Sequence, residues 1–78
     1  MPDVFRDEVR AASLKTDDDV LFGYIIKRAS ERLTETEMIS LFSVSRTTLD
    51  RWKEGRTTPH RLIKPRVYQI LLQRLQSS

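Results

Sequence analysis

The sequence predicts an all-α domain of four to five helices, and three observations lead to this fold class. The chain has 78 residues, a length that accommodates one domain with a modest core. No stretch alternates apolar and polar residues with the two-residue period of a strand. Apolar residues recur instead every three or four positions, as on the buried face of a helix.

The composition argues against several classes of protein. The chain has no cysteine and a single histidine, His60, so disulfides and thiolate metal sites are excluded. We expect no catalytic residues, no metal, no cofactor and no small-molecule substrate. The first residues are acidic and lack the apolar core of a signal peptide, and no apolar run reaches the ~20 residues of a membrane span. These features predict a cytoplasmic protein that is not an enzyme.

Charge is divided unevenly along the chain. Residues 1–44 hold nine acids and six bases, a net charge of −3, whereas residues 45–78 hold two acids and eight bases, a net charge of +6. A basic half beside an acidic half suggests that one face of the protein meets a polyanion. The alternative is an ordinary solvated charged surface.

The first expected element spans residues 3–14, within an N-terminal arm or short helix of residues 1–15 that precedes the main domain of residues 16–78. Residues at helical spacing give this segment one shared face. That face consists of Val4, Phe5, Glu8, Val9 and Ala12. We therefore expect a short amphipathic helix or an arm that docks on the domain.

The second helix is expected from about Thr16 to Arg32. Thr16 or Asp17 is the expected N-cap, and the acids that follow oppose the positive end of the helix dipole. A run of three aspartates at a helix start is a cap more often than a metal-ligand cluster. The expected buried face consists of Val20, Leu21, Tyr24, Ile25 and Arg28.

Two short helices are expected next. Thr34 and Glu37 have the spacing of a capping box at the start of the first of them. Its core stripe consists of Met38, Leu41 and Phe42. Ser45 is the expected N-cap of the second, which covers residues 46–54, and Gly55 suits the positive φ that often ends a helix.

The second short helix has two different faces. At about 100° per residue, one arc carries Leu49 and Trp52 together with Ser45 and Thr48, and we expect the two apolar side chains to be buried. The opposite, outward arc carries Arg46, Thr47, Asp50, Arg51 and Glu54.

A basic loop over residues 56–64, in which His60 is expected to be a loop or cap residue, leads to the last helix. This helix is expected from Pro65, whose missing N–H costs nothing in a first turn, to about Gln76. Its apolar residues cover more than half of its circumference: Val67, Tyr68, Ile70, Leu71, Leu72 and Leu75. We expect the apolar residues beyond those needed for one core face either to cover the N-terminal segment or to pair with a second subunit.

The stretch LTETEMISLFSVSRTTLDRWKEGRTTP, residues 33–59, resembles the lambda repressor and Cro-type (XRE-like) helix-turn-helix family. The positions that agree are Leu33, Thr34, Met38, Phe42, Val44, Ser45, Thr48, Leu49, Trp52, Gly55 and Pro59. The resemblance implies a lambda repressor-like DNA-binding fold. It also implies sequence-specific binding in the major groove of double-stranded DNA by a transcriptional regulator, a repressor that acts by occupying its operator.

Three positions depart from the family pattern. Ile39 stands where the family favours alanine, so we expect the two short helices to lie further apart or to cross differently. Ser43 replaces the turn glycine, so we expect a less tightly left-handed turn. Glu35 replaces a glutamine that in the family often touches phosphate, and its carboxylate is expected to repel the DNA backbone.

The resemblance also assigns roles to the outward residues. Arg46, Thr47 and Arg51 match the base-reading positions, and an arginine can donate two hydrogen bonds to guanine. Asp50 is expected to pair with Arg46 one turn away, or to accept a hydrogen bond from cytosine. The residues expected to contact the DNA backbone are Ser45, Thr48, Lys53, Arg56 and Thr57. Without the resemblance, these side chains would be read as a solvated helix face and an ordinary basic loop.

Two alternatives to gene regulation remain open. The chain can be the DNA-targeting module of a recombination, replication or antitoxin system. In a different class, it can be a protein-interaction adaptor whose basic helical surface meets an acidic partner. A homodimer is a further hypothesis, since two-fold dimers are usual for this motif.

Overall fold

The computed structural model describes residues 4–77, and these form an all-helical domain. The helices, in chain order, are α1 (Val4–Ala12), α2 (Asp19–Ala29), α3 (Glu35–Phe42), α4 (Arg46–Lys53) and α5 (Lys64–Ser77). No strand occurs among the described residues, so the predicted fold class is confirmed. The first segment was predicted to begin at Asp3, which lies outside the described residues.

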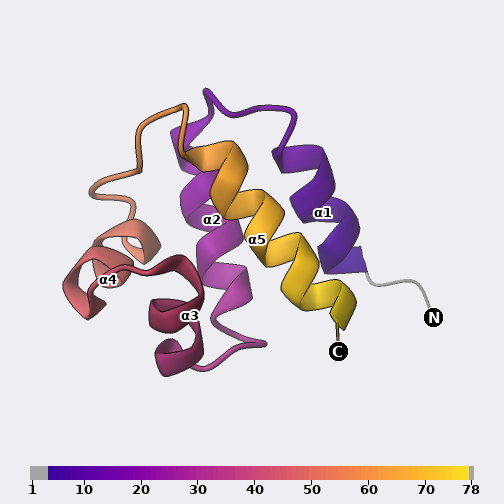
Figure 1. Cartoon of the computed structure of the whole chain (residues 1–78). Coiled ribbons are helices and arrows are strands. Elements are labelled where there is room, and N and C mark those ends of the chain that lie inside the picture. Colours follow the sequence, from indigo (N-terminus) through magenta and orange to yellow (C-terminus); the bar gives the residue numbers. More distant parts are fainter. Residues whose placement is uncertain (1–3, 78) are drawn as a thin grey trace.

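The long helices α2 and α5 form the centre of the molecule (Figure 1). Helix α1 packs against both of them at one edge, while α4 packs against α2 and α3 at the other edge. Helix α3 also contacts α5, which closes the bundle. The two outer helices α1 and α4 therefore lie at opposite edges of the domain.

Helix α1 contributes directly to the core. Phe5, Val9 and Ala12 are buried, as predicted, and their spacing of four and three residues places them on one face. Val4 was also expected on this face, but its side chain is 65% exposed. The buried stripe of α1 is therefore narrower than predicted.

The N-cap of α2 is Asp18, not Thr16 or Asp17 as predicted. Its carboxylate accepts a hydrogen bond from the backbone N–H of Leu21 at 2.9 Å. The helix ends at Ala29, three residues earlier than predicted, and turns follow. The aspartate run is therefore a helix start in which one carboxylate caps the chain.

The predicted buried face of α2 is wrong at two positions. Val20 and Tyr24 are 85% and 48% exposed. The residues that α2 buries are Phe22, Gly23, Ile25, Ile26 and Ala29. Apolar residues occur almost all round the first two turns, so the helical period alone allowed either face.

Gly23 allows α2 and α4 to approach closely. A Cβ at this position would lie 3.3 Å from the carbonyl oxygen of Trp52 and 3.8 Å from the Cα of Gly55. The first of these distances is tighter than an ordinary van der Waals contact. The missing side chain thus sets how near the end of α4 lies to the central helix.

The connection from α3 to α4 is held by local hydrogen bonds. The predicted capping box is confirmed: the N–H of Glu37 donates to Thr34 Oγ1 at 3.1 Å, and the Glu37 carboxylate accepts from the N–H of Thr34. Ser43 is left-handed, with φ 56° and ψ 46°, so the expectation of a less left-handed turn is wrong. The Val44 N–H can then donate to the Ile39 carbonyl at 3.2 Å, which closes the end of α3.

Helix α4 is anchored by its inner face, as predicted. Leu49 is fully buried, and Trp52 is only 5% exposed. The Trp52 ring meets the ring of Phe22 edge-on, with the centroids 5.3 Å apart, and lies 6.4 Å from the ring of Phe42. The predicted positive φ of Gly55, 75°, ends the helix.

Helix α5 begins at Lys64, one residue before its predicted start. Lys64 is itself buried, and its ammonium group pairs with the Asp19 carboxylate at the start of α2. Val67, Tyr68 and Leu71 are buried, while the remaining apolar side chains are half-buried against the core. Since α5 packs against α1 as well as α3, part of its wide apolar face covers the N-terminal segment.

Candidate nucleic-acid interface

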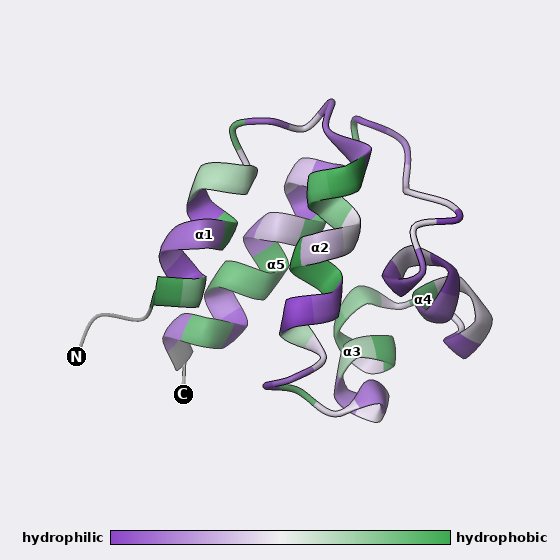
Figure 2. Ribbon diagram, turned by 180° about the vertical axis from the view of Figure 1, so that it is seen from behind, coloured by the Kyte–Doolittle hydropathy of each residue, from purple (hydrophilic) through white to green (hydrophobic). Residues whose placement is uncertain are grey.

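The outward face of α4 is polar and exposed. Arg46, Thr47 and Arg51 are all exposed, and the side chain of Arg46 is 74% accessible. In Figure 2 the ribbon of α4 is mostly in the hydrophilic colour, whereas α2 is in the hydrophobic colour over much of its length. These three of the four residues predicted to read bases therefore lie where an external partner can reach them; the fourth, Asp50, is half-buried.

The predicted ion pair between Arg46 and Asp50 does not form. Asp50 instead lies 3.7 Å from the ammonium group of Lys53, three residues further along α4. The guanidinium of Arg46 lies 3.3 Å from the carboxylate of Glu35, which is the first residue of α3. A partner on the neighbouring helix thus replaces the partner that spacing along one helix had suggested.

Glu35 contacts two cations of α4. One carboxylate oxygen is 3.3 Å from Arg46 Nη2, and the other is 3.9 Å from Lys53 Nζ. Arg46 and Lys53 are seven residues apart, which is about two helical turns, so they lie along the same edge of α4. The sequence pattern indicated that Glu35 is unfavourable to phosphate, but it did not show that Glu35 lies between two bases.

Arg51 has a different environment. It projects from the side of α4 away from Glu35, because five helical steps after Arg46 turn it by about 140°. It forms no ion pair with any residue between 4 and 77. Thr47 lies one turn before Arg51 on the same outward stripe. Arg51 is thus a cation on this face that residues 4–77 do not neutralise.

The hydroxyl groups at the start of α4 are used by the helix itself. Ser45 Oγ accepts a hydrogen bond from the Thr48 N–H at 3.1 Å, which confirms Ser45 as the predicted N-cap. The same hydroxyl lies 3.0 Å from Thr48 Oγ1. Thr48 is half-buried, while Ser45 is exposed, so Ser45 is the more accessible of these two predicted backbone contacts.

The loop after α4 carries further polar groups. Arg56 is exposed and lies 3.1 Å from the Glu54 carboxylate, and Thr57 is exposed beside it. The Leu62 N–H donates to Nδ1 of His60 at 3.1 Å, which confirms His60 as a loop residue that holds a turn.

A groove between α2 and α4 adds one cation that the sequence analysis missed. It has a volume of about 670 Å³ and is lined by Lys27, Ser30, Asp50, Lys53 and Glu54. Lys27 lies far from α4 in the sequence, so only the packing of α2 against α4 brings it to this side of the molecule. The groove thus holds two bases, Lys27 and Lys53, beside two acids, Asp50 and Glu54.

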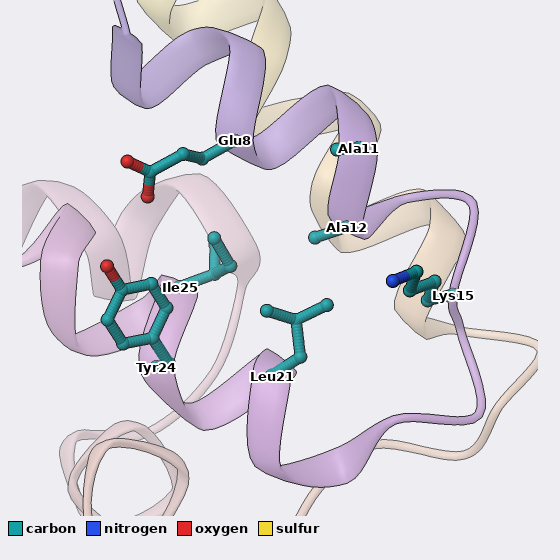
Figure 3. A pocket seen from close by; sticks show the side chains of 7 residues that line it. All are labelled: Glu8, Ala11, Ala12, Lys15, Leu21, Tyr24 and Ile25. Carbon is teal, nitrogen blue, oxygen red and sulfur yellow. The ribbon is translucent and has the colours of Figure 1, made fainter.

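A second hollow, of about 350 Å³, lies between α1 and α2 (Figure 3). It is lined by Glu8, Ala11, Ala12, Lys15, Leu21, Tyr24 and Ile25. The lining is mostly apolar, with one acid and one base. The hollow adjoins α1 and therefore lies at the edge of the domain opposite α4 (Figure 1).

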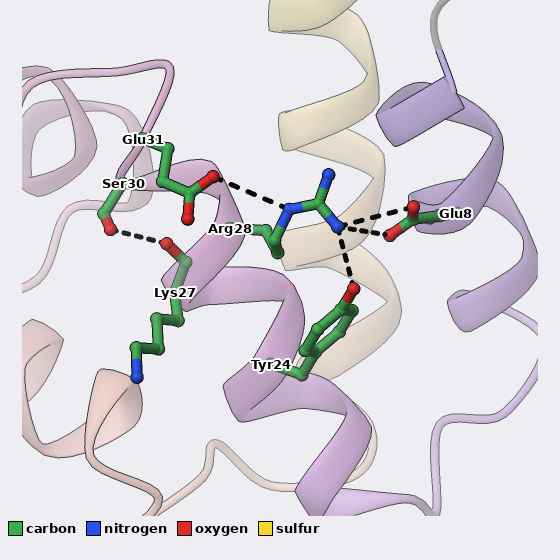
Figure 4. Close-up of polar contacts among 6 residues, drawn as sticks. All are labelled: Glu8, Tyr24, Lys27, Arg28, Ser30 and Glu31. Atoms are coloured by element: carbon green, nitrogen blue, oxygen red, sulfur yellow. Dashed lines mark hydrogen bonds and ion pairs between the residues drawn. The ribbon is translucent and has the colours of Figure 1, made fainter.

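Arg28 forms a charged cluster that fastens α1 to α2 (Figure 4). Its Nη1 atom donates to the Glu8 carboxylate at 3.2 Å and to the Tyr24 hydroxyl at 2.7 Å. Its guanidinium also lies over the ring of Phe5, 5.4 Å from the centroid. This cluster is built from the two packed helices and faces away from α4.

Residues 4–77 hold no candidate metal site and no helix that could span a membrane. Within that range no three histidine, aspartate or glutamate side chains gather into a candidate metal site. None of the helices there combines the length and the apolar character needed to cross a membrane.

Comparisons with protein-family models, with curated proteins and with solved structures find no match to this chain. The function of the protein is therefore inferred from the geometry of α4 and its surroundings, together with the sequence pattern of residues 33–59.

Proposed function

We propose that the protein binds double-stranded DNA in a sequence-specific manner, with α3 and α4 as a helix-turn-helix and α4 in the major groove. The observation that carries this proposal is the division of α4. Leu49 and Trp52 are buried, while Arg46, Thr47 and Arg51 on the other side are exposed. The resemblance of residues 33–59 to the lambda repressor and Cro-type family supports the same function.

Arg51 is the strongest candidate for direct base reading. Its guanidinium has no ion pair with residues 4–77 that must be broken before it meets DNA. Two parallel hydrogen bonds to O6 and N7 of a guanine are worth roughly 1–3 kcal/mol of discrimination. Thr47, on the same stripe, offers a methyl group for thymine and a hydroxyl for a phosphate or a base edge.

Other residues at this edge suit the phosphate backbone. Ser45 is exposed at the start of α4, Lys53 lies along its side, and Arg56 and Thr57 follow its end. Contacts from such residues set register and affinity without reading sequence. Occupancy of an operator by this face would block or recruit a polymerase, which makes a transcriptional regulator the proposed role. A homodimer on two half-sites would double the contact area.

The test is selection from a random pool of duplex DNA at near-physiological salt, followed by titration of the selected sequence. We expect Arg51→Ala to relax the preference at one base position. We expect Lys53→Ala to weaken all sequences alike and to reduce the slope of log affinity against log salt by about one. Arg10→Ala, which removes the same charge from α1 at the opposite edge, is the matched control and should bind like the wild type.

A pool from which no consensus is recovered, with Arg51→Ala and Arg10→Ala indistinguishable, would contradict the proposal. Binding to an acidic protein surface with no dependence on DNA sequence would favour the adaptor instead. A palindromic consensus would support binding as a dimer.

A further inference from the structure

The cations of the proposed DNA-binding face are not equally available. In the free protein Arg46 lies 3.3 Å and Lys53 3.9 Å from Glu35, Lys53 also lies 3.7 Å from Asp50, and Arg51 has no ion-pair partner between residues 4 and 77. One carboxylate therefore bridges two bases on one edge of α4, much as a DNA phosphate would.

The position of Glu35 is fixed by its local structure. It is the first residue of α3, directly after the N-cap Thr34, and the capping box between Thr34 and Glu37 holds this turn. The Glu35 side chain is only 33% exposed and the Lys53 side chain only 27% exposed. The carboxylate is thus held at the seam between α3 and α4 rather than extended into solvent.

We propose that Glu35 is an internal competitor of DNA: it holds Arg46 and Lys53 in the free protein, and a phosphate must displace it when DNA binds. This inference rests on the proposed function. It assigns Glu35 a regulatory role at the same site, because its charge lowers affinity through two cations and leaves Arg51 unaffected.

The energetics allow such an exchange. Ion pairs at this exposure are individually weak, so a phosphate with its higher charge density can replace the carboxylate. A cation that remains paired with Glu35 neutralises no phosphate, so fewer counterions leave the DNA on binding. Glu35 therefore limits both the affinity and its dependence on salt.

The experiment measures binding of the selected duplex by wild-type protein and by Glu35→Gln over a range of salt concentrations. Glutamine keeps the size of the side chain and removes its charge. We expect binding to tighten about three- to tenfold, as the loss of two weak ion pairs predicts. The salt slope should become steeper by about one. Asp7→Asn, which removes the same charge from α1, is the matched control and should change binding less than twofold.

Combined variants show which cations carry the effect. In an Arg46→Ala/Lys53→Ala background the gain from Glu35→Gln should disappear, whereas in an Arg51→Ala background it should persist. Urea unfolding of each variant verifies that it is folded under the binding conditions.

Two results would overturn the inference: Glu35→Gln binding no tighter than Asp7→Asn, or a gain that survives loss of both Arg46 and Lys53. In either case, the proposed function still stands if Arg51→Ala weakens DNA binding relative to the wild type. Absence of sequence-dependent DNA binding by the wild type and by Glu35→Gln would overturn the proposed function, and this inference with it.

Discussion

The outer helices α1 and α4 lie at opposite edges of the same central pair and are used in different ways (Figure 1). They have similar lengths, nine and eight residues. Helix α1 buries three residues, including the large ring of Phe5, and completes the core. Among the residues of α4, Leu49 and Trp52 are the two that are buried. The rest of the helix is at least partly exposed to solvent. One helix serves mainly to stabilise the domain, and the other is presented to solvent.

The charged clusters beside the two helices differ in the same way. Arg28, beside α1, has a side chain that is 31% exposed, and it contacts a carboxylate, a hydroxyl and an aromatic ring at once. Arg46, on α4, has a side chain that is 74% exposed, and its ion pair is with Glu35. An arginine side chain thus forms a fixed contact between helices at Arg28 and an exchangeable ion pair at Arg46. Burial and the number of partners make the difference.

The largest effects are expected from removing one anchor of each outer helix. Phe5→Ala should lower the free energy of unfolding by about 3–5 kcal/mol, and Leu49→Ala by about 2–5 kcal/mol, because each leaves a cavity in the core. Urea unfolding followed by Trp52 fluorescence measures both losses. At equal folded fraction, Leu49→Ala should also weaken DNA binding, while Phe5→Ala should not. If both variants weakened it equally, the proposed separation of roles would be wrong.

A smaller effect is expected at the entry to α4. Ser43 is left-handed, a conformation that costs an L-residue about 1–2 kcal/mol and costs glycine almost nothing. Glycine also loses more chain entropy than serine when the protein folds, and this cost offsets part of the gain. Ser43→Gly should therefore raise the free energy of unfolding by about 0.5–1 kcal/mol. Thermal unfolding measures the gain. Ser43→Ala is the control: an equal gain from alanine would show that the backbone conformation is not the cause.

The smallest effect concerns pH and the scaffold that both outer helices share. A hydrogen bond from Lys64 lowers the pKa of Asp19 below its ordinary 3.8. A hydrogen bond from Arg74 likewise lowers the pKa of Glu37 below its ordinary 4.5. Because both values are lower in the folded state, the stabilisation is complete above the ordinary pKa values. It is lost as the pH falls through the folded ones.

The midpoint temperature of thermal unfolding of the wild type should therefore decrease below about pH 5, because these carboxylates become protonated. An Asp19→Asn/Glu37→Gln variant should start from a lower midpoint at neutral pH and lose less of it on acidification. Parallel curves for the two proteins would contradict this assignment.

Most features that depend on neighbours along the chain were predicted correctly, although the N-cap of α2 and the turn at Ser43 were not. The capping box at Thr34 and Glu37, the cap at Ser45 and the positive φ of Gly55 all depend on residues within one turn. The buried position of Trp52 was also correct. The outward arc of α4 is mainly polar, so only one orientation of this helix buries its apolar side chains.

Features that depend on which helices meet were predicted less well. The face of α2 was misplaced because the apolar residues on both sides of this helix satisfy the helical period. Arg46 was assigned a partner on its own helix, whereas the nearer carboxylate belongs to Glu35 on α3. The spacing along one helix cannot rank such competitors, because it contains no information about the adjacent helix.

The sequence by itself determined that the chain is helical, where α3 and α4 begin, and which side of α4 is apolar, since these follow from hydrogen bonds and periodicity within one or two turns. Only the tertiary structure decided that α2 turns Phe22 and Ile26 inward, that Lys64 is buried against Asp19, and that Glu35 lies between Arg46 and Lys53. Those choices depend on contacts between segments far apart in the chain, and packing selects among partners that local spacing leaves equivalent.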